Sequence, residues 1–217
     1  MIGISDIRMR VFGYKPTTPP KHTAVRYLAL AQLWFLVLIL VCFALQPQAL
    51  TANDGLSYFG VHWQTIIPFG LSCTLAGFFT LRAADTLPPA RRPLGLVALV
   101  LRISGLLLAG ILFTPYSIGP IFDSIHRLFG TVLFLSQLGL VGWLSLRGRL
   151  SVFNALLLLL QFTGGVLAYL SLNDWLPFEV LGQLLFQAAF GLLIIRLVSA
   201  ELDTPAPRMP ASPTNQS

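Results

Sequence analysis

Six long apolar segments are spaced along the chain, each close to the length of helix that crosses a bilayer. Charged residues, proline or glycine separate them, and they run over roughly 27–46, 63–82, 94–115, 121–146, 151–172 and 178–200. About 20 apolar residues of α-helix span the ~30 Å of hydrocarbon in a membrane. The pattern therefore predicts an all-α fold, a polytopic membrane protein built as a bundle of six transmembrane helices.

The composition agrees with this fold. Of the 217 residues 55% are hydrophobic and only 10% are charged, whereas a soluble domain carries about 25% charged residues. This excludes a cytosolic enzyme. The two cysteines, Cys42 and Cys73, lie inside apolar segments and form neither a disulfide framework nor a redox motif. About 26 residues precede the first segment and no small-residue cleavage site follows it, so we interpret it as a retained helix rather than a signal peptide.

The basic residues predict the orientation, because Lys and Arg are retained on the cytoplasmic side. With the N-terminus inside, twelve of the fourteen Lys and Arg residues are cytoplasmic: Arg8, Arg10, Lys15, Lys21, Arg26, Arg82, Arg91, Arg92, Arg147, Arg149, Arg196 and Arg208. Both termini are then cytoplasmic. We expect a cytoplasmic tail over 1–26, a six-helix transmembrane domain over 27–200 and a disordered cytoplasmic tail over 201–217, which is rich in Pro, Ser and Thr.

The net charge of +6 does not indicate nucleic acid, because the basic residues fall between membrane segments. Arginine outnumbers lysine by 12 to 2, which is typical of a GC-rich bacterial genome. We therefore expect the membrane to be a bacterial plasma membrane.

Acidic residues and histidines gather instead at the outer ends of the segments. They are Asp54, Asp123, Asp174, Glu179, His62 and His126, and Arg127 is the only basic residue beside them. Polar residues also form stripes on two predicted helices. In the fourth segment, after Pro120, they are Asp123, His126 and Arg127, with Gly130 and Gln137 close to the same face. In the sixth, Glu179, Gln183, Gln187 and Gly191 recur every four residues.

Polar stripes facing lipid would cost several kcal/mol, so we expect them to face each other or a wet cavity. The hypothesis is an outward-opening polar pocket among the second, fourth and sixth helices. Its candidate residues are His62, Asp123, His126, Arg127, Glu179, Gln183 and Gln187. The alternative is that these side chains hydrogen-bond between helices and hold the bundle together.

A metal site is an alternative use of the same residues. His62, Asp123, His126 and Glu179 have side chains suited to a divalent metal such as Zn²⁺. The chain has no His-Glu-x-x-His motif, so these ligands would have to converge from separate helices. Our expectation is a protein without a cofactor, and the divalent metal remains the alternative.

These features favour a function in binding or handling a lipid or small amphiphile, or as an accessory subunit of an envelope complex. The expected partners are membrane lipid and other membrane-protein subunits. An alternative is an outward-facing, metal-dependent membrane hydrolase with His126 and Asp123 in acid/base or ligand roles. A further alternative is a proton-coupled secondary transporter in which Glu179 or His126 titrates.

Three further features concern packing. Arg102 lies about eight residues inside the third segment, where its long side chain can reach back toward the inner headgroups near Asp85. Small residues are expected to allow close helix contacts; they are Gly105, Ala109, Gly164, Gly165 and Ala168. Asn154 and Gln161, seven apart, share a face of the fifth helix.

Two segments carry a resemblance to known proteins. They are Asn53–Gly60, with the sequence NDGLSYFG, and the stretch from Thr114–Ser117 to Asp123–Arg127. Both resemble segments of actinobacterial six-helix integral membrane proteins of unknown function. The layout is also similar to that of the damage-regulated autophagy modulator (DRAM) type, in which a short outer loop containing serine leads into the second helix. The resemblance implies a membrane protein of this shape and assigns no catalytic residue.

Overall fold

The structure, a computed structural model, describes residues 22–51, 55–89, 91–147, 151–172 and 175–204. These residues form six long helices: α2 (Thr23–Leu45), α3 (Ile66–Thr86), α4 (Arg92–Phe113), α5 (Pro120–Arg147), α6 (Val152–Leu172) and α7 (Glu179–Asp203). The same ranges hold the short 3₁₀ helices η1 (Pro47–Thr51), η2 (Gly55–Gly60) and η3 (Tyr116–Ile118) and contain no β-strand. The predicted all-α fold class is confirmed.

Each long helix belongs to a stretch of 21 to 28 residues that is apolar enough to cross a membrane, so all six predicted spans are confirmed. Two boundaries differ from the predicted domain limits. α2 begins at Thr23, within the predicted tail. α7 continues to Asp203, because Leu202 is buried in the core, and Thr204 then becomes extended ahead of Pro205.

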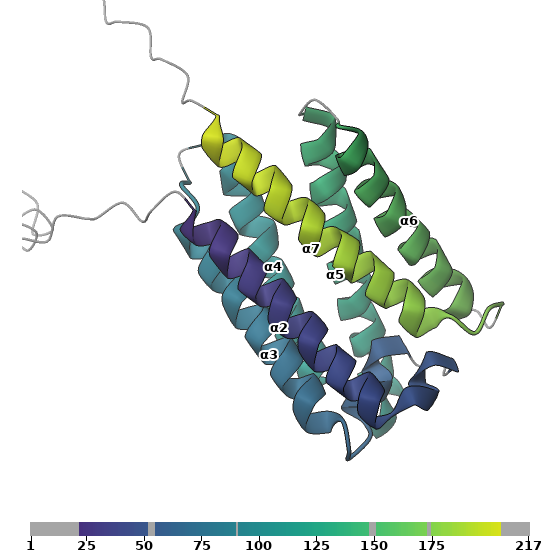
Figure 1. The fold of residues 1–217 in the computed structure, drawn as a ribbon. Coiled ribbons are helices and arrows are strands. Elements are labelled where there is room, and N and C mark those ends of the chain that lie inside the picture. Colours follow the sequence, from purple (N-terminus) through teal and green to yellow (C-terminus); the bar gives the residue numbers. More distant parts are fainter. Residues whose placement is uncertain (1–21, 52–54, 90, 148–150, 173–174, 205–217) are drawn as a thin grey trace, which may run out of the picture.

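The chain crosses the bundle back and forth, so the start of α2 and the end of α7 lie at the same end (Figure 1). We call the opposite end the cap end; it carries the connections α2–α3, α4–α5 and α6–α7. Several residues singled out above lie outside the described residues: Arg8, Arg10, Lys15, Lys21, Asn53, Asp54, Arg149, Asp174 and Arg208. Most of both predicted tails lies outside them as well.

α7 is the central helix of the bundle. Half of its apolar window is buried inside the protein, compared with 28% to 33% for the other five spans. It packs against α6, α2 and α5 and also touches η1 and η2 at the cap end (Figure 1). The polar stripe that starts at Glu179 therefore lies on the helix with the least contact to the surroundings.

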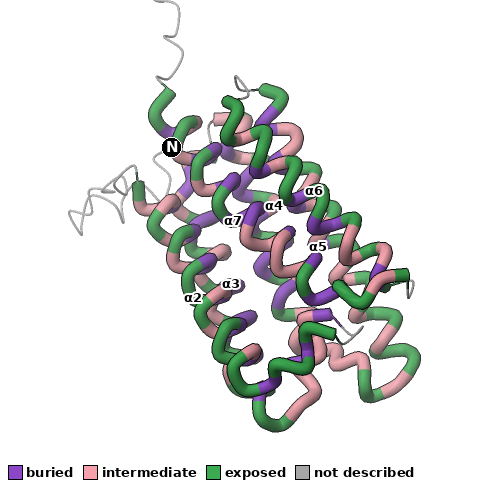
Figure 2. The backbone as a smooth tube through the Cα atoms, turned by 45° about the vertical axis from the view of Figure 1, so that its right-hand side comes forward, coloured by how far each residue is buried: buried purple, intermediate pink, exposed green. Residues whose placement is uncertain are grey.

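The outward faces of the helices are apolar and exposed, as green stretches along α2 and α6 show in Figure 2. Leu40 on α2, Leu106 on α4 and Leu159 on α6 are all at least 60% exposed. A continuous apolar surface of this kind is unfavourable in water but matches the hydrocarbon of a bilayer. The surface thus agrees with the membrane assignment from helix length.

Small residues bring α6 and α7 into backbone contact. A Cβ placed on Gly164 would lie 2.6 Å from the Phe186 nitrogen, and one on Gly182 would lie 2.5 Å from the Ala168 nitrogen. Gly105 in α4 approaches α3 in a similar way, since its Cβ would lie 3.2 Å from the Gly77 carbonyl oxygen. The expectation that these glycines allow close helix packing is confirmed.

Polar side chains between helices are paired in two places, of which the first was predicted. Arg102 forms a salt bridge of 3.2 Å with Asp85, and both side chains are about half exposed. Asn154 on α6 accepts a hydrogen bond of 3.1 Å from Arg196 on α7. The second contact places the predicted polar face of α6 against α7.

Gln161 lies on that face and provides a test of the packing. It is fully buried, and neither of its amide atoms has a hydrogen-bond partner among the described residues. A buried polar group without a partner costs about 1–3 kcal/mol. We expect Gln161→Leu to stabilise the bundle by an amount of this order, measured as a higher melting temperature in detergent. As an opposite control, Gln183→Leu removes two hydrogen bonds and should lower it; equal shifts would contradict the prediction.

Candidate functional site

The connection between α2 and α3 folds over the cap end. We call its described residues, 46–51 and 55–65, the cap segment. Phe59 in η2 is fully buried and packs edge-on against Phe43 of α2, with ring centres 5.0 Å apart. The Thr65 hydroxyl donates to the Phe59 carbonyl oxygen at 2.9 Å. Phe59 and Thr65 therefore fix η2 in place over the helix ends.

The outer part of the α7 stripe anchors the cap segment. The Leu56 amide donates to Gln183 Oε1 at 2.8 Å, and Gln183 Nε2 donates to Glu179 Oε1 at 2.9 Å. Glu179 is only 6% exposed. Gly55 has a left-handed backbone, with φ of +61°, and its Cα faces both side chains so closely that a Cβ would lie 2.6 Å from Glu179 Oε1. Glu179 and Gln183 thus hold the loop rather than an open pocket.

His126 and Ser57 make the second contact between the cap segment and the helices. Ser57 Oγ in η2 lies 2.6 Å from His126 Nε2 in the second turn of α5. The other ring nitrogen, His126 Nδ1, lies 2.7 Å from the carbonyl oxygen of Thr114, at the end of α4. Three separate elements therefore meet at one imidazole.

The partners of His126 define its tautomer. A carbonyl oxygen can only accept, so Nδ1 carries the proton and donates to Thr114. In the neutral ring Nε2 is then an acceptor, and the Ser57 hydroxyl donates to it. A hydroxyl hydrogen-bonded to an imidazole that a third group orients is the arrangement of an activated nucleophile and its base.

A small cavity of about 20 Å³ lies beside this pair. Apolar side chains, including Val61, Phe69 and Ile111, form most of its wall. Ser57, His126 and Tyr116 supply the polar part of the wall. The cavity thus combines an apolar surface with hydrogen-bonding groups near the ends of membrane-spanning helices.

Asp123 and Arg127 are separate from this pair. Arg127 Nε donates to Asp123 Oδ1 at 2.9 Å, and 61% of the arginine side chain is exposed. Asp123 therefore pairs along its own helix, and the group that orients His126 is the Thr114 carbonyl instead.

His62 stays within the cap segment. Its Nδ1 lies 2.7 Å from the Tyr58 carbonyl oxygen, and its ring stacks on the Tyr58 ring at 3.9 Å between centres. It does not line the cavity beside His126. The structure thus separates His62 from the other histidine of the predicted pocket.

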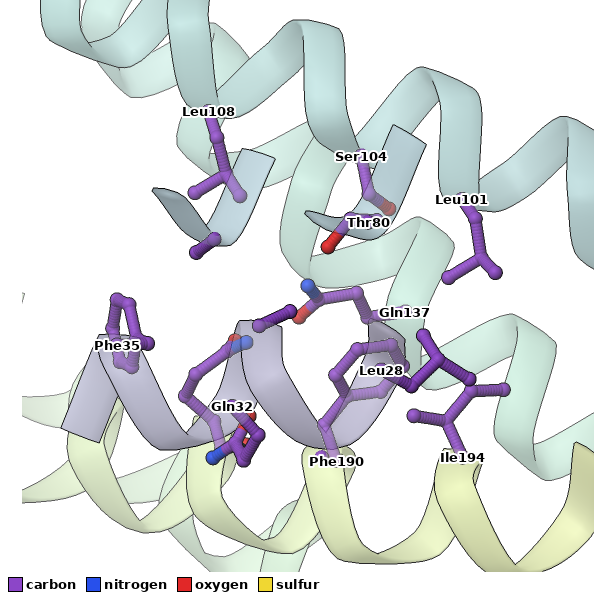
Figure 3. A pocket seen from close by; sticks show the side chains of 14 residues that line it. Leu28, Gln32, Phe35, Thr80, Leu101, Ser104, Leu108, Gln137, Phe190 and Ile194 are labelled. Atoms are coloured by element: carbon purple, nitrogen blue, oxygen red, sulfur yellow. The ribbon is translucent and has the colours of Figure 1, made fainter. Parts of the chain in front are cut away.

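Gln187 lies deeper, at a second cavity of about 30 Å³ in the middle of the bundle. Its backbone carbonyl accepts a hydrogen bond of 3.2 Å from Gln32 Nε2. Figure 3 shows the Gln137 amide pointing into this space, with the side chains of Thr80 and Ser104 nearby, and Gln32 also lines it. Ser104 Oγ is buried without a partner among the described residues. This volume holds about two water molecules, which such groups can bind.

The four residues considered as metal ligands thus each have different partners, and His62 contacts Tyr58. Across the described ranges, no three His, Cys, Asp or Glu side chains come close enough to hold a metal ion together. His126 contacts Ser57, Asp123 contacts Arg127, and Glu179 contacts Gln183. The geometry therefore supplies no built metal site from His62, Asp123, His126 and Glu179.

The candidate site includes Ser57 and Thr114, which are not part of the predicted polar stripes, although both lie in the two segments that carry the resemblance. Both lie at breaks between helices, where no periodicity indicates which way a side chain points. A signal in the sequence is position: a serine in the loop just before the second span and a histidine near the start of the fourth reach the same end of a bundle.

Comparisons of the chain with protein-family models, curated proteins and solved structures give no match.

Proposed function

We propose that this integral membrane protein binds the polar head of a membrane lipid or small amphiphile at the outer leaflet, at the edge of the cavity beside His126. The observation that carries the proposal is the wall of that cavity, which is apolar except for Ser57, Tyr116 and His126. An amphiphile at the membrane interface presents the same combination, an apolar chain next to hydrogen-bonding groups. The cavity accepts the polar group at its edge, and the flanking helix faces accept the chain.

The distribution of charge supports the orientation. The described loop α3–α4 carries Arg91, the last turn of α5 carries Arg147, and Arg196 lies about two turns before the end of α7; all three are away from the cap end. Because Lys and Arg are retained in the cytoplasm, the cap end faces outward and both termini face inward. Arginine-rich composition favours a bacterial plasma membrane. In this orientation the Ser57–His126 pair meets the outer leaflet.

Lipid retention tests the proposal. The protein is purified in mild detergent with equal amounts of phosphatidylglycerol and phosphatidylethanolamine, and native mass spectrometry measures the lipid bound per chain. We expect one tightly retained lipid. His126→Leu should lower its occupancy about tenfold, because it removes the side chain that holds the Ser57 hydroxyl at the wall of the cavity, and losing a hydrogen bond costs up to about 1.5 kcal/mol.

His22→Gln is the matched control, because His22 is an exposed histidine at the opposite end of the bundle. It should retain the lipid as the unchanged protein does. Equal retention by the two variants would mean that bound lipid is distributed over the apolar surface, and it would overturn the proposed site.

A further inference from the structure

We infer that Ser57 is a nucleophile and His126 its general base, so that the site transfers the acyl group of an ester whose carbonyl group reaches the adjoining cavity. This inference deepens the proposed function and rests on it for the substrate, an amphiphile with an ester near its polar head. The chemistry has separate support, which is the distance of 2.6 Å between Ser57 Oγ and His126 Nε2.

The geometry around the imidazole matches the requirements of a base. Nucleophile and base must lie about 2.6–3.2 Å apart, and a third group must orient the base. Ser57 and His126 meet the first condition, and the Thr114 carbonyl, 2.7 Å from Nδ1, meets the second. Unrelated hydrolases combine a serine and a base in many different folds, so the arrangement is recognised by geometry rather than by sequence position.

The partial burial of the pair also fits this role. Ser57, His126 and Thr114 are all of intermediate exposure, so they are neither sealed in the core nor fully in water. The hydroxyl and the imidazole both line the cavity. An ester carbonyl entering from the membrane interface would meet the Ser57 oxygen there.

The reaction needs no further cofactor. Ser57 Oγ attacks the carbonyl carbon of the ester, the Oγ–carbon bond forms, and the hydroxyl proton moves to His126 Nε2. The ester carbon–oxygen bond then breaks, and Nε2 returns the proton to the leaving alcohol. Water, or the hydroxyl of a second amphiphile, next attacks the acyl group on Ser57 and gives its proton to Nε2. The acyl–Oγ bond breaks, Oγ regains a proton, and a carboxylic acid or a new ester is released.

An alkyl fluorophosphonate tests the inference on the full-length protein in detergent, because it reacts with activated serines. The unchanged protein should form one covalent adduct on Ser57, located by peptide mass spectrometry. Ser57→Ala should lose it. His126→Gln keeps a hydrogen-bonding side chain but no base, and should react about 100-fold more slowly, the lower range for general base catalysis. Ser124→Ala is the control: Ser124 is exposed, its hydroxyl donates a hydrogen bond to the Pro120 carbonyl, and its loss should leave the labelling unchanged.

The outcomes separate the inference from the proposed function. No adduct on Ser57, or equal rates in His126→Gln and the unchanged protein, would overturn the inference, and lipid retention would still support binding. An adduct with the expected dependence on His126, in a protein that retains no lipid, would support the nucleophile and overturn the lipid-binding proposal. If the melting temperatures of Ser57→Ala and His126→Gln lie within a few degrees of that of the unchanged protein, lost labelling reflects lost chemistry. If Ser57→Ala fails to fold, Ser57→Cys replaces it and should be labelled by a thiol reagent instead.

Discussion

Replacing Gly164 or Gly182 with leucine is expected to separate α6 from α7 and lower the stability of the whole bundle. A Cβ at Gly164 would lie 2.6 Å from the Phe186 nitrogen and 2.7 Å from the Gly182 carbonyl oxygen. These are backbone atoms of a helix, so they cannot move aside as a flexible side chain can. Overpacking typically costs about 1–3 kcal/mol, and here the backbone of the central helix must shift, so we expect a loss of about 3 kcal/mol.

For a chain of this size that loss corresponds to a melting temperature lower by about 10 °C. The measurement is thermal unfolding in detergent, followed by circular dichroism. Gly139→Leu is the matched control, because a Cβ at Gly139 in α5 has nothing within 4 Å. A drop of equal size in the control would show that glycine itself, rather than the contact, determines the stability.

The transmembrane part of the fold could be predicted from the sequence because membrane spans depend on length and apolarity alone. The prediction for α5, residues 121–146, differs from Pro120–Arg147 by one residue at each end. The stripe on α7 was also predictable, since residues four apart on a helix face the same side. Glu179 and Gln183 accordingly share a hydrogen bond of 2.9 Å.

The partners of that stripe could not be predicted, because they lie in the cap segment. Residues 55–60 form a 3₁₀ helix whose contacts depend on tertiary folding rather than on periodicity. The pocket expected between helices is instead covered at this point by Gly55 and Leu56, which contact Gln183. Spacing alone did not reveal that one polar face would serve as an anchor for a loop.

The environment of His126 shows the same limit. The spacing places Asp123, His126 and Arg127 near one face of α5, and opposite charges four apart attract each other. Asp123 and Arg127 do pair, at 2.9 Å. The imidazole turns instead to Ser57, which is 69 positions away in the chain. A contact of that separation is set by how α3, α4 and α5 meet at the cap end.

Substituting Gly55 with valine is expected to release the cap segment from α7 while leaving the six spans folded. Gly55 has a φ of +61°, a conformation that costs a residue with a side chain roughly 1–2 kcal/mol. A Cβ would also lie 2.6 Å from Glu179 Oε1 and 2.8 Å from Gln183 Oε1. These two effects act on the same short segment. The ends of the Glu179 and Gln183 side chains can move aside, but the backbone strain remains, and either change separates the loop from its anchor on α7.

The movement should break the Leu56–Gln183 hydrogen bond of 2.8 Å. Because Ser57 lies only two residues after Gly55 in η2, it should also move away from His126. Amide hydrogen exchange over residues 55–60 should therefore rise by about tenfold or more, because losing one hydrogen bond and a strained fit together costs over 1.4 kcal/mol, a factor of ten. Labelling of Ser57 by the fluorophosphonate should fall with it.

Gly119→Ala is the control for this change. Gly119 lies at the same end of the bundle, its backbone is extended with φ of 161°, and a Cβ there meets nothing within 4 Å. It should leave both the exchange and the labelling unchanged. If Gly55→Val kept the Leu56 amide protected, then Glu179 and Gln183 would not be the anchor of the cap segment. If exchange rose but Ser57 were labelled at an unchanged rate, the nucleophile would not depend on the position in which η2 holds it against His126.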